Sequence, residues 1–137
     1  MNSEQTMPTI VSCRGVSKTY QQGKVAVKAL TDIDLGVEGG GFIALAGPSG
    51  SGKTTLLNLI GGLDTPDAGA IEVDGKAYAD LSRSAMADLR LHSIGFVFQA
   101  YNLIPVLSAL ENVEYVMLLQ GVAREERRRR AREILDV

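Results

Sequence analysis

The eight residues from Gly47 to Thr54, Gly-Pro-Ser-Gly-Ser-Gly-Lys-Thr, constrain this chain more than any other segment. They fit the pattern G-x-x-x-x-G-K-[ST], which a chain of this length and average composition matches by chance with a probability of roughly half a percent. Before the loop, Phe42 to Ala46 is a short continuous apolar run, as in a strand buried on both faces. After it, Thr54 to Ile60 has helix spacing and is followed by two glycines. The sequence therefore predicts a strand, a glycine-rich loop and a helix, in that order.

Such a loop is suited to a polyphosphate. Glycines allow successive backbone amides to turn inward, and the helix N-terminus adds a partial positive charge. Lys53 is expected to reach the β- and γ-phosphates of a nucleotide, and the Thr54 hydroxyl is expected to be a Mg²⁺ ligand. A glycine turn that only caps a helix would not need Lys followed by Thr at this offset. The residues expected to contact the nucleotide are Gly47, Pro48, Ser49, Gly50, Ser51, Gly52, Lys53, Thr54 and Thr55.

The rest of the N-terminal part is predicted to be rich in strands, and the C-terminal part in helices. Val, Ile and Thr with partial alternation indicate strands, Asp-Gly indicates a hairpin turn, and Asp64 to Gly69 has turn chemistry. The predicted strands are Thr9 to Val16, Lys24 to Val37, Ala70 to Val73 and Ile94 to Phe98, and a short helix is predicted from Ser82 to Leu91.

Two helices are predicted in the last third of the chain. Ser108 and Glu111 fit a capping box, in which the serine side chain accepts from an early amide and the glutamate reaches back. The helix that follows should run to Gln120, and Gly121 should end it. Its predicted apolar face consists of Leu110, Val113, Val116 and Met117, and an arginine-rich helix should follow.

Length and composition indicate one soluble globular domain. A chain of 137 residues allows a single core, and 45% apolar with 22% charged residues is close to the average for folded proteins. Apolar runs reach about five residues, far below the roughly 20 that a spanning helix needs. The net charge of −2 gives no reason to expect nucleic acid. The single Cys13 excludes an internal disulfide, and residues 1–8 contain no apolar leader segment, which favours a reducing cytoplasm.

With these motifs, residues 9 to 137 resemble the first half of an ATP-binding-cassette (ABC) ATPase, the motor of ABC transporters. Val16-Ser-Lys-Thr-Tyr20 resembles the strand end where that family places an aromatic ring against adenine. On its own Tyr20 would fit packing at a strand end equally well. Gln99, after Ile94-Gly-Phe-Val-Phe98, matches the family's Q-loop glutamine. The resemblance implies that this glutamine meets Mg²⁺ or the attacking water and that its loop contacts a membrane domain.

The segments Asp64 to Gly75, Tyr101 to Pro105 and Leu107 to Val113 are similar to one branch of the family, the motors of macrolide-exporter and lipoprotein-release systems. The implied fold class is α/β, a P-loop NTPase of the ABC nucleotide-binding type with an N-terminal antiparallel β subdomain. Within one such domain, residues 9–81 would form the β subdomain and P-loop core, residues 82–106 the core helix, strand and Q-loop, and residues 107–137 the start of the helical subdomain.

The family completes its site downstream of the Q-loop, and the resemblance therefore implies a truncated motor. No Leu-Ser-Gly-Gly-Gln signature loop, strand ending in Asp-Glu (Walker B) or switch histidine occurs in residues 1–137. We expect ATP and Mg²⁺ binding with assistance from Lys53 and Gln99, and no catalytic residue within the chain. The expected partners are a membrane-embedded permease, contacted through the Q-loop region, and a second ATP-binding subunit, with no nucleic acid. The expected location is the cytoplasmic face of the plasma membrane.

Other residues and function classes are less favoured. His92 has no second ligand or nucleophile near it in sequence, Cys13 fits a small strand residue, and neither Glu111 nor Glu114 is expected to be a catalytic base. The run Arg127 to Arg130 could contact nucleic acid, but Glu125, Glu126 and Glu133 stand at helical pairing offsets and favour a solvated face. A GTPase would need an Asn-Lys-x-Asp motif, and small nucleoside kinases usually begin with their phosphate loop. A soluble ABC-type ATPase without a transport role is the alternative.

Overall fold

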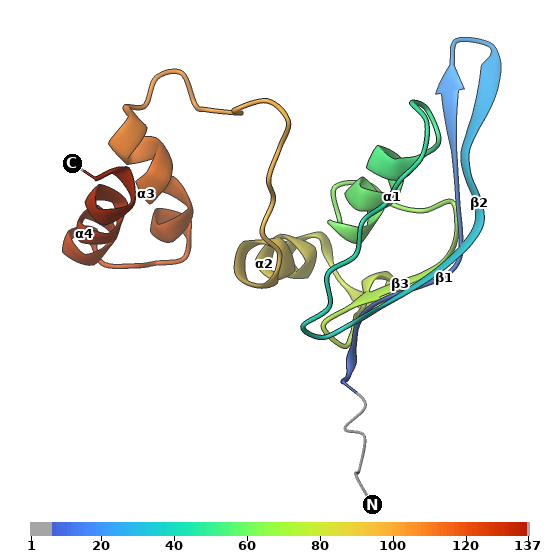
Figure 1. The fold of residues 1–137 in the computed structure, drawn as a ribbon, viewed down its shortest axis with the longest axis horizontal. Coiled ribbons are helices and arrows are strands. Elements are labelled where there is room, and N and C mark those ends of the chain that lie inside the picture. Colours follow the sequence, from blue (N-terminus) through green and yellow to red (C-terminus); the bar gives the residue numbers. More distant parts are fainter. Residues whose placement is uncertain (1–6, 137) are drawn as a thin grey trace, which may run out of the picture. The chain divides into compact units, whose positions relative to one another are not determined.

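The computed structural model describes residues 7–136, and the chain divides into two compact units, one ending at Met86 and the other beginning at Ala87 (Figure 1). We describe each unit by itself. The elements are β1 (Thr9–Gln22), β2 (Val25–Glu38), α1 (Lys53–Ile60), β3 (Ala68–Val73), β4 (Lys76–Ala77), the 3₁₀ helix η1 (Tyr78–Asp80), α2 (Arg83–Ser93), α3 (Ala109–Leu119) and α4 (Arg124–Leu135).

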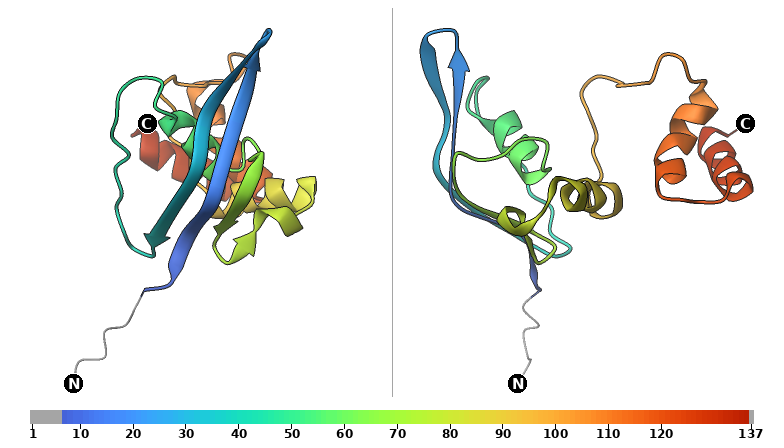
Figure 2. Two further views of the ribbon diagram at one scale, coloured as in Figure 1. Left: turned by 90° about the vertical axis from the view of Figure 1, so that its right-hand side faces the viewer. Right: turned by 180° about the vertical axis from the view of Figure 1, so that it is seen from behind.

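The first unit is built on a four-stranded antiparallel sheet with the order β2-β1-β3-β4, in which β1 pairs with both β2 and β3 (Figure 2). The register of β1 and β2 runs from Thr9 opposite Glu38 to Gln22 opposite Val25. Between β3 and β4, Asp74 and Gly75 both have positive φ, as a two-residue type I′ hairpin turn requires. The predicted N-terminal antiparallel β subdomain is therefore confirmed, with β1 and β3 longer than the sequence indicated.

Helix α1 packs against strands β1, β2 and β3 and closes the core of this unit (Figure 1). Its apolar positions Leu56 and Leu59 are buried, together with Val16 and Ile71 of the sheet and the thiol of Cys13. Burial raises the pKa of the Cys13 thiol above its ordinary value, which fits the predicted role of a small apolar strand residue. Because α1 begins immediately after the glycine-rich loop, this core fixes the position of the end of the loop that joins α1.

The predicted buried strands over residues 42–46 and 94–98 are wrong for this structure, because both segments are irregular. Phe42 is 97% exposed and Val97 is fully exposed. A strand needs a neighbouring backbone to pair with, and within residues 7–136 all ladder pairs lie among β1 to β4. Local apolar patterning was sufficient for the prediction, but it does not supply the partner strand.

In the second unit, α3 and α4 pack against each other, and the two helices predicted for this part of the chain are confirmed. The capping box of α3 is confirmed: the Ser108 hydroxyl accepts from the Glu111 amide at 3.3 Å, and Glu111 accepts from the Ser108 amide at 2.8 Å. Leu110, Val113 and Met117 of α3 are half-buried, but Val116 is 53% exposed. Buried Glu114 takes its place, so the inner face follows positions 110, 113, 114 and 117.

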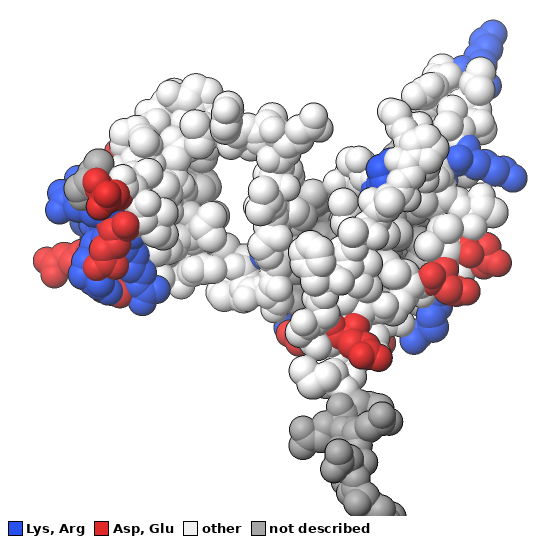
Figure 3. Space-filling view, viewed as in Figure 1, with Lys and Arg blue, Asp and Glu red and all other residues white. Residues whose placement is uncertain are grey.

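Glu114 is held by arginines of α4. Arg127 Nε donates to it at 3.0 Å, and Arg128 Nε lies 3.6 Å from its other carboxylate oxygen. The remaining arginines pair along α4 as predicted, with Arg129 and Arg130 contacting Glu126 at 2.7 and 2.6 Å. Basic and acidic side chains are consequently mixed over the surface of α4 (Figure 3).

Candidate functional site

The loop over residues 47–52 has the backbone geometry that its glycines make possible. Gly52 lies in the left-handed region with φ of 89° and forms the N-cap of α1. A Cβ at this position would lie 2.5 Å from the Ala29 carbonyl oxygen and 2.8 Å from a methyl group of Leu30. Both the conformation and the close approach to β2 therefore require glycine at position 52.

Lys53 closes the loop on itself. Its ammonium donates to the carbonyl oxygens of Gly47 at 2.8 Å and Pro48 at 2.6 Å, and to the Ser51 hydroxyl at 3.1 Å. The side chain is half-buried at the start of α1, so its charge stays beside the loop. A single cation thus lies where the expected terminal phosphates of a nucleotide would be bound.

The N-terminus of α1 differs from that of α3 in what stabilises it. No side chain caps α1 at Gly52, and its first turn contains no acidic residue. In contrast, α3 has a complete capping box with Glu111 in the first turn. The partial positive charge of α1 is therefore not offset by an acidic residue of its own first turn, and Thr54 and Thr55 add hydroxyl groups there. This end of α1 suits an anion.

Tyr20 lies in β1 and belongs to the same unit as the loop. Its hydroxyl donates to Asp64 Oδ2 at 2.8 Å, and the Lys18 ammonium lies 5.3 Å from the centre of its ring. Burial, followed by the bond to Asp64, raises the pKa of the Tyr20 hydroxyl, and a hydrogen bond with Thr55 at the start of α1 acts in the opposite direction. The structure therefore brings Tyr20 together with the loop helix.

Lys18 and Asp64 were not among the predicted site residues. Lys18 is 8% exposed and donates to Asp64 Oδ1 at 2.9 Å and to the Thr65 carbonyl at 2.6 Å. The only signal in the sequence is that Lys18 stands two residues before Tyr20 and so shares its face of the strand. Asp64 lies 44 positions after Tyr20, in a segment that predicted a turn and resembled one branch of the family but indicated no contact with Tyr20.

Gln99 belongs to the second unit, where it is exposed in a bend. The irregular segment before it is stacked locally, with the parallel rings of Phe96 and Phe98 5.6 Å apart. Of the predicted site residues, those from 47 to 55 and Tyr20 form one group in the first unit. Gln99 stands in the other unit.

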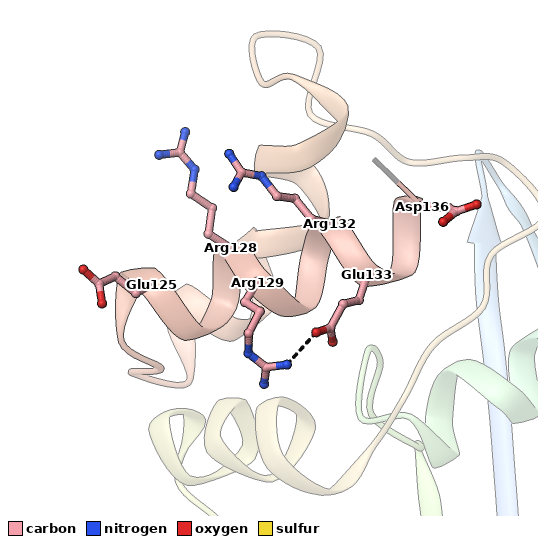
Figure 4. A pocket seen from close by; sticks show the side chains of 6 residues that line it. All are labelled: Glu125, Arg128, Arg129, Arg132, Glu133 and Asp136. Atoms are coloured by element: carbon pink, nitrogen blue, oxygen red, sulfur yellow. Dashed lines mark hydrogen bonds and ion pairs between the residues drawn. The ribbon is translucent and has the colours of Figure 1, made fainter.

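The hollows in the surface of the second unit are lined by ion pairs. One follows α4, where Arg128 and Arg132 extend from one side and Arg129 bonds Glu133 at 2.6 Å (Figure 4). The other lies between α3 and α4 around Glu114. These charges neutralise one another, so neither hollow presents a uniform field to an anion. The candidate site is therefore the exposed loop of the first unit.

Protein side chains alone do not form a metal cage in residues 7–136, where no group of three His, Cys, Asp or Glu residues could hold an ion. No helix in this part of the chain combines the length and apolar character of a bilayer-crossing segment.

Comparison with known proteins supplies the family. A family model described as "ABC transporter" matches residues 30–137. The chain is 44% identical over 126 residues to the lipoprotein-releasing system ATP-binding protein LolD of Chromohalobacter salexigens, covering 92% of this chain and 53% of LolD. It is 41% identical over 132 residues to the macrolide export ATP-binding/permease protein MacB 1/2 of Paracoccus denitrificans, covering 96% of this chain and 20% of that protein.

The fold is similar to solved structures of the cassette MJ0796 of Methanocaldococcus jannaschii. One is the dimeric post-hydrolysis state bound to ADP and Pi, with a TM-score of 0.85 and 43% identity, covering 92% of this chain and 56% of that one. A second dimeric structure of MJ0796 gives the same values. The chain spans about half the length of LolD and of MJ0796. The predicted fold class is confirmed.

Proposed function

Because the chain belongs to the ABC transporter family, we propose that it is an ATP-binding part of an ABC transporter that holds Mg-ATP at residues 47–55. The observation that carries this proposal is the arrangement at the start of α1. A helix N-terminus without a side-chain cap or a first-turn acid adjoins a glycine loop with one lysine beside it. Uncapped amides at the helix start, the helix charge and an ammonium together match a polyphosphate.

Magnesium fits this donor set. Mg²⁺ takes oxygen ligands and usually keeps several waters and substrate phosphate oxygens. The Thr54 hydroxyl would be the ligand from α1. The bound ion would neutralise phosphate charge.

The base would be held by Tyr20. Its ring lies in the same unit as the phosphate loop, and its hydroxyl interacts with Thr55 in the first turn of α1. Stacking on an aromatic ring accepts adenine without a particular hydrogen-bond pattern. The proposed nucleotide site therefore uses β1 for the base and residues 47–55 for the phosphates.

The proposed assembly follows the relatives. LolD is named as an ATP-binding protein of a lipoprotein-releasing system and MacB as an ATP-binding/permease protein. We assign this chain the same role, with a membrane-embedded permease contacted near Gln99, a second ATP-binding subunit, and a place at the cytoplasmic membrane face. Residues 1–137 would then be part of one nucleotide-binding domain, divided as the sequence predicts at residues 81/82 and 106/107. Copurification with a permease tests this assignment.

Nucleotide binding and hydrolysis make different demands on the residues present. Hydrolysis needs a group that positions water, and the family's glutamate for that purpose follows a strand that residues 1–137 do not contain. We propose that residues 1–137, tested as a separate polypeptide, bind Mg-ATP without hydrolysing it, whereas hydrolysis belongs to the ATPase activity of the family as a whole.

The test is a titration of Mg-ATP into purified protein, with phosphate release measured on the same preparation. Lys53→Ala removes the cation at the expected terminal phosphates and should abolish binding. Lys24→Ala, which removes an exposed lysine in the β1–β2 turn, is the control and should bind as the unmodified protein does. Equal affinity of Lys53→Ala and the unmodified protein would refute the proposed site. Phosphate release that disappears in Lys53→Ala would refute the claim that this polypeptide is inactive.

A further inference from the structure

The Lys18 side chain is the centre of a cluster that ties the end of β1 to the loop after α1. Its ammonium donates to Asp64 Oδ1 at 2.9 Å and to the Thr65 carbonyl at 2.6 Å, and it lies 3.8 Å from Asp67 Oδ1. It is 8% exposed, which is rare for a lysine and requires that its charge be compensated. Both aspartates supply that compensation.

Backbone bonds fasten the same two segments. The Thr19 amide donates to Asp67 Oδ2 at 2.7 Å, and the Asp67 amide donates to the Ser17 carbonyl at 2.9 Å. The loop from Asp64 to Asp67 is therefore fixed along β1 residues 17–20 by side chains and by backbone groups together. Such a doubly fixed cluster leaves little freedom to a side chain that is bonded to it.

Tyr20 is that side chain. Its hydroxyl donates to Asp64 Oδ2 at 2.8 Å, so Asp64 accepts from Tyr20 with one oxygen and from Lys18 with the other. The ammonium also lies over the Tyr20 ring, 5.3 Å from its centre. The ring is thus held at two points, by its hydroxyl and by one of its faces. The bond to Lys18 is the main cause that lowers the pKa of Asp64, and the bond to Asp64 is the main cause that raises the pKa of Lys18.

We propose that Lys18 and Asp64 are positioning residues for nucleotide binding: they preset the Tyr20 ring so that the face opposite Lys18 receives the base. This inference rests on the proposed stacking of adenine on Tyr20. Since the hydroxyl already donates its one proton to Asp64, Tyr20 offers the base its ring face and no hydrogen-bond donor. Fixing a rotatable side chain before binding removes about 0.5–1.5 kcal/mol of ordering cost, a factor of about 2 to 13 in affinity.

The experiment compares two ligands, Mg-ATP and Mg-tripolyphosphate, by calorimetric titration of the purified protein. Tripolyphosphate uses the phosphate loop and lacks a base, so the ratio of the two affinities reports the contact with adenine. Asp64→Asn and Lys18→Met should each lower ATP affinity about 3- to 10-fold and leave tripolyphosphate affinity within about twofold. Glu72→Gln, which breaks the exposed Arg14–Glu72 pair between β1 and β3, is the matched control and should change neither.

A double variant separates positioning from general support of the fold. In a Tyr20→Ala background, Asp64→Asn should cause no further loss of ATP affinity, because no ring remains to be positioned. Three outcomes would each overturn the inference. These are an equal loss of ATP affinity with and without Tyr20, an equal loss of affinity for ATP and for tripolyphosphate, and an unchanged ATP affinity. If Asp64→Asn does not fold, Lys18→Met decides alone, since methionine retains the apolar stem in the buried position.

The outcomes also separate this inference from the proposed function. An unmodified protein that binds neither ligand would refute the phosphate site itself. One that binds both ligands equally would refute the stacking of adenine on Tyr20. A preference for ATP that persists in Asp64→Asn and Lys18→Met would refute the positioning role and leave the proposed function intact.

Discussion

Replacing Glu114 tests whether burial or bond length decides the strength of an ion pair in the helical unit. Glu114 is 9% exposed and accepts from Arg127 at 3.0 Å, with Arg128 at 3.6 Å. Glu126 has shorter contacts, 2.7 Å to Arg129 and 2.6 Å to Arg130, but both of these arginines are more than half exposed. Bond length alone would make Glu126 the more important residue.

Burial predicts instead that Glu114 contributes more to stability than Glu126. Removing one partner of a buried pair costs about 3–5 kcal/mol, because the other charge is left without compensation. Arg127 is 17% exposed in its side chain and also donates to the Val122 carbonyl at 3.2 Å, so it retains one partner and some water. We therefore expect Glu114→Ala to lower the free energy of unfolding by about 2–3 kcal/mol. Glu114→Leu should cost less than Ala, since it fills the space between α3 and α4.

Glu126→Ala is the matched control, and its stability should stay close to that of the unmodified protein. Arg129, and then Arg130, holds the pKa of Glu126 at about 2, but solvent screens exposed pairs. The assay is urea unfolding followed by far-ultraviolet circular dichroism, at low salt and at about 1 M salt, where the Debye length is about 3 Å. The Glu114 effect should persist at high salt. If Glu126→Ala proved as destabilising as Glu114→Ala, burial would not be the deciding factor.

Three further predictions concern the first unit and the exposed segments. Tyr20→Ala should weaken ATP binding by about 1–3 kcal/mol in a titration, and Tyr20→Phe by about 0.5–1.5 kcal/mol, because Phe keeps the ring and loses the bond to Asp64. Lys18 lowers the pKa of Asp64, so the ionised Asp64 stabilises the folded protein fully above pH 3.8, the ordinary pKa of an aspartate. This contribution to the free energy of unfolding is lost as the pH falls through the lower pKa of the folded state. Thermal melts at a series of pH values should show the loss, and Asp64→Asn should make the melting temperature less dependent on pH. The exposed apolar runs around Phe42 and Val97 should make the polypeptide of residues 1–137 self-associate as its concentration rises, which light scattering would detect. The double variant Phe42→Asp with Val97→Asp should reduce this association.

Local signals in the sequence predicted local structure well. The loop motif that opens its helix, the Asp74-Gly75 turn and the Ser108–Glu111 capping box each depend on residues at most seven positions apart. The chemistry of these residues is therefore sufficient to specify the backbone. The phosphate-binding residues belong to this class, and this is why the main part of the candidate site could be predicted.

Features that depend on distant partners could not be predicted. Phe42 begins an apolar run that would suit a buried strand, yet its structure depends on whether another backbone pairs with it. Asp64 meets Tyr20 only because the loop after α1 lies along β1. The arginines of α4 were expected to pair within their own helix, which holds for Arg129, but Arg127 reaches Glu114 of α3. Tertiary packing decides these contacts, and one sequence does not reveal it.

The Lys53 ammonium donates three hydrogen bonds within its own loop, and these acceptors compete with any anion for the ammonium. The carbonyl oxygens of Gly47 and Pro48 are tethered close to the ammonium, so their effective concentration around it is high whatever the concentration of ligand in solution. An anion with a single phosphate or sulfate group makes too few contacts to displace them, whereas a chain of phosphates that also engages the α1 amides gains several contacts for the ones it replaces. The loop would in this way discriminate by ligand valency, and phosphate or sulfate at ordinary cellular levels would leave it available to nucleotides.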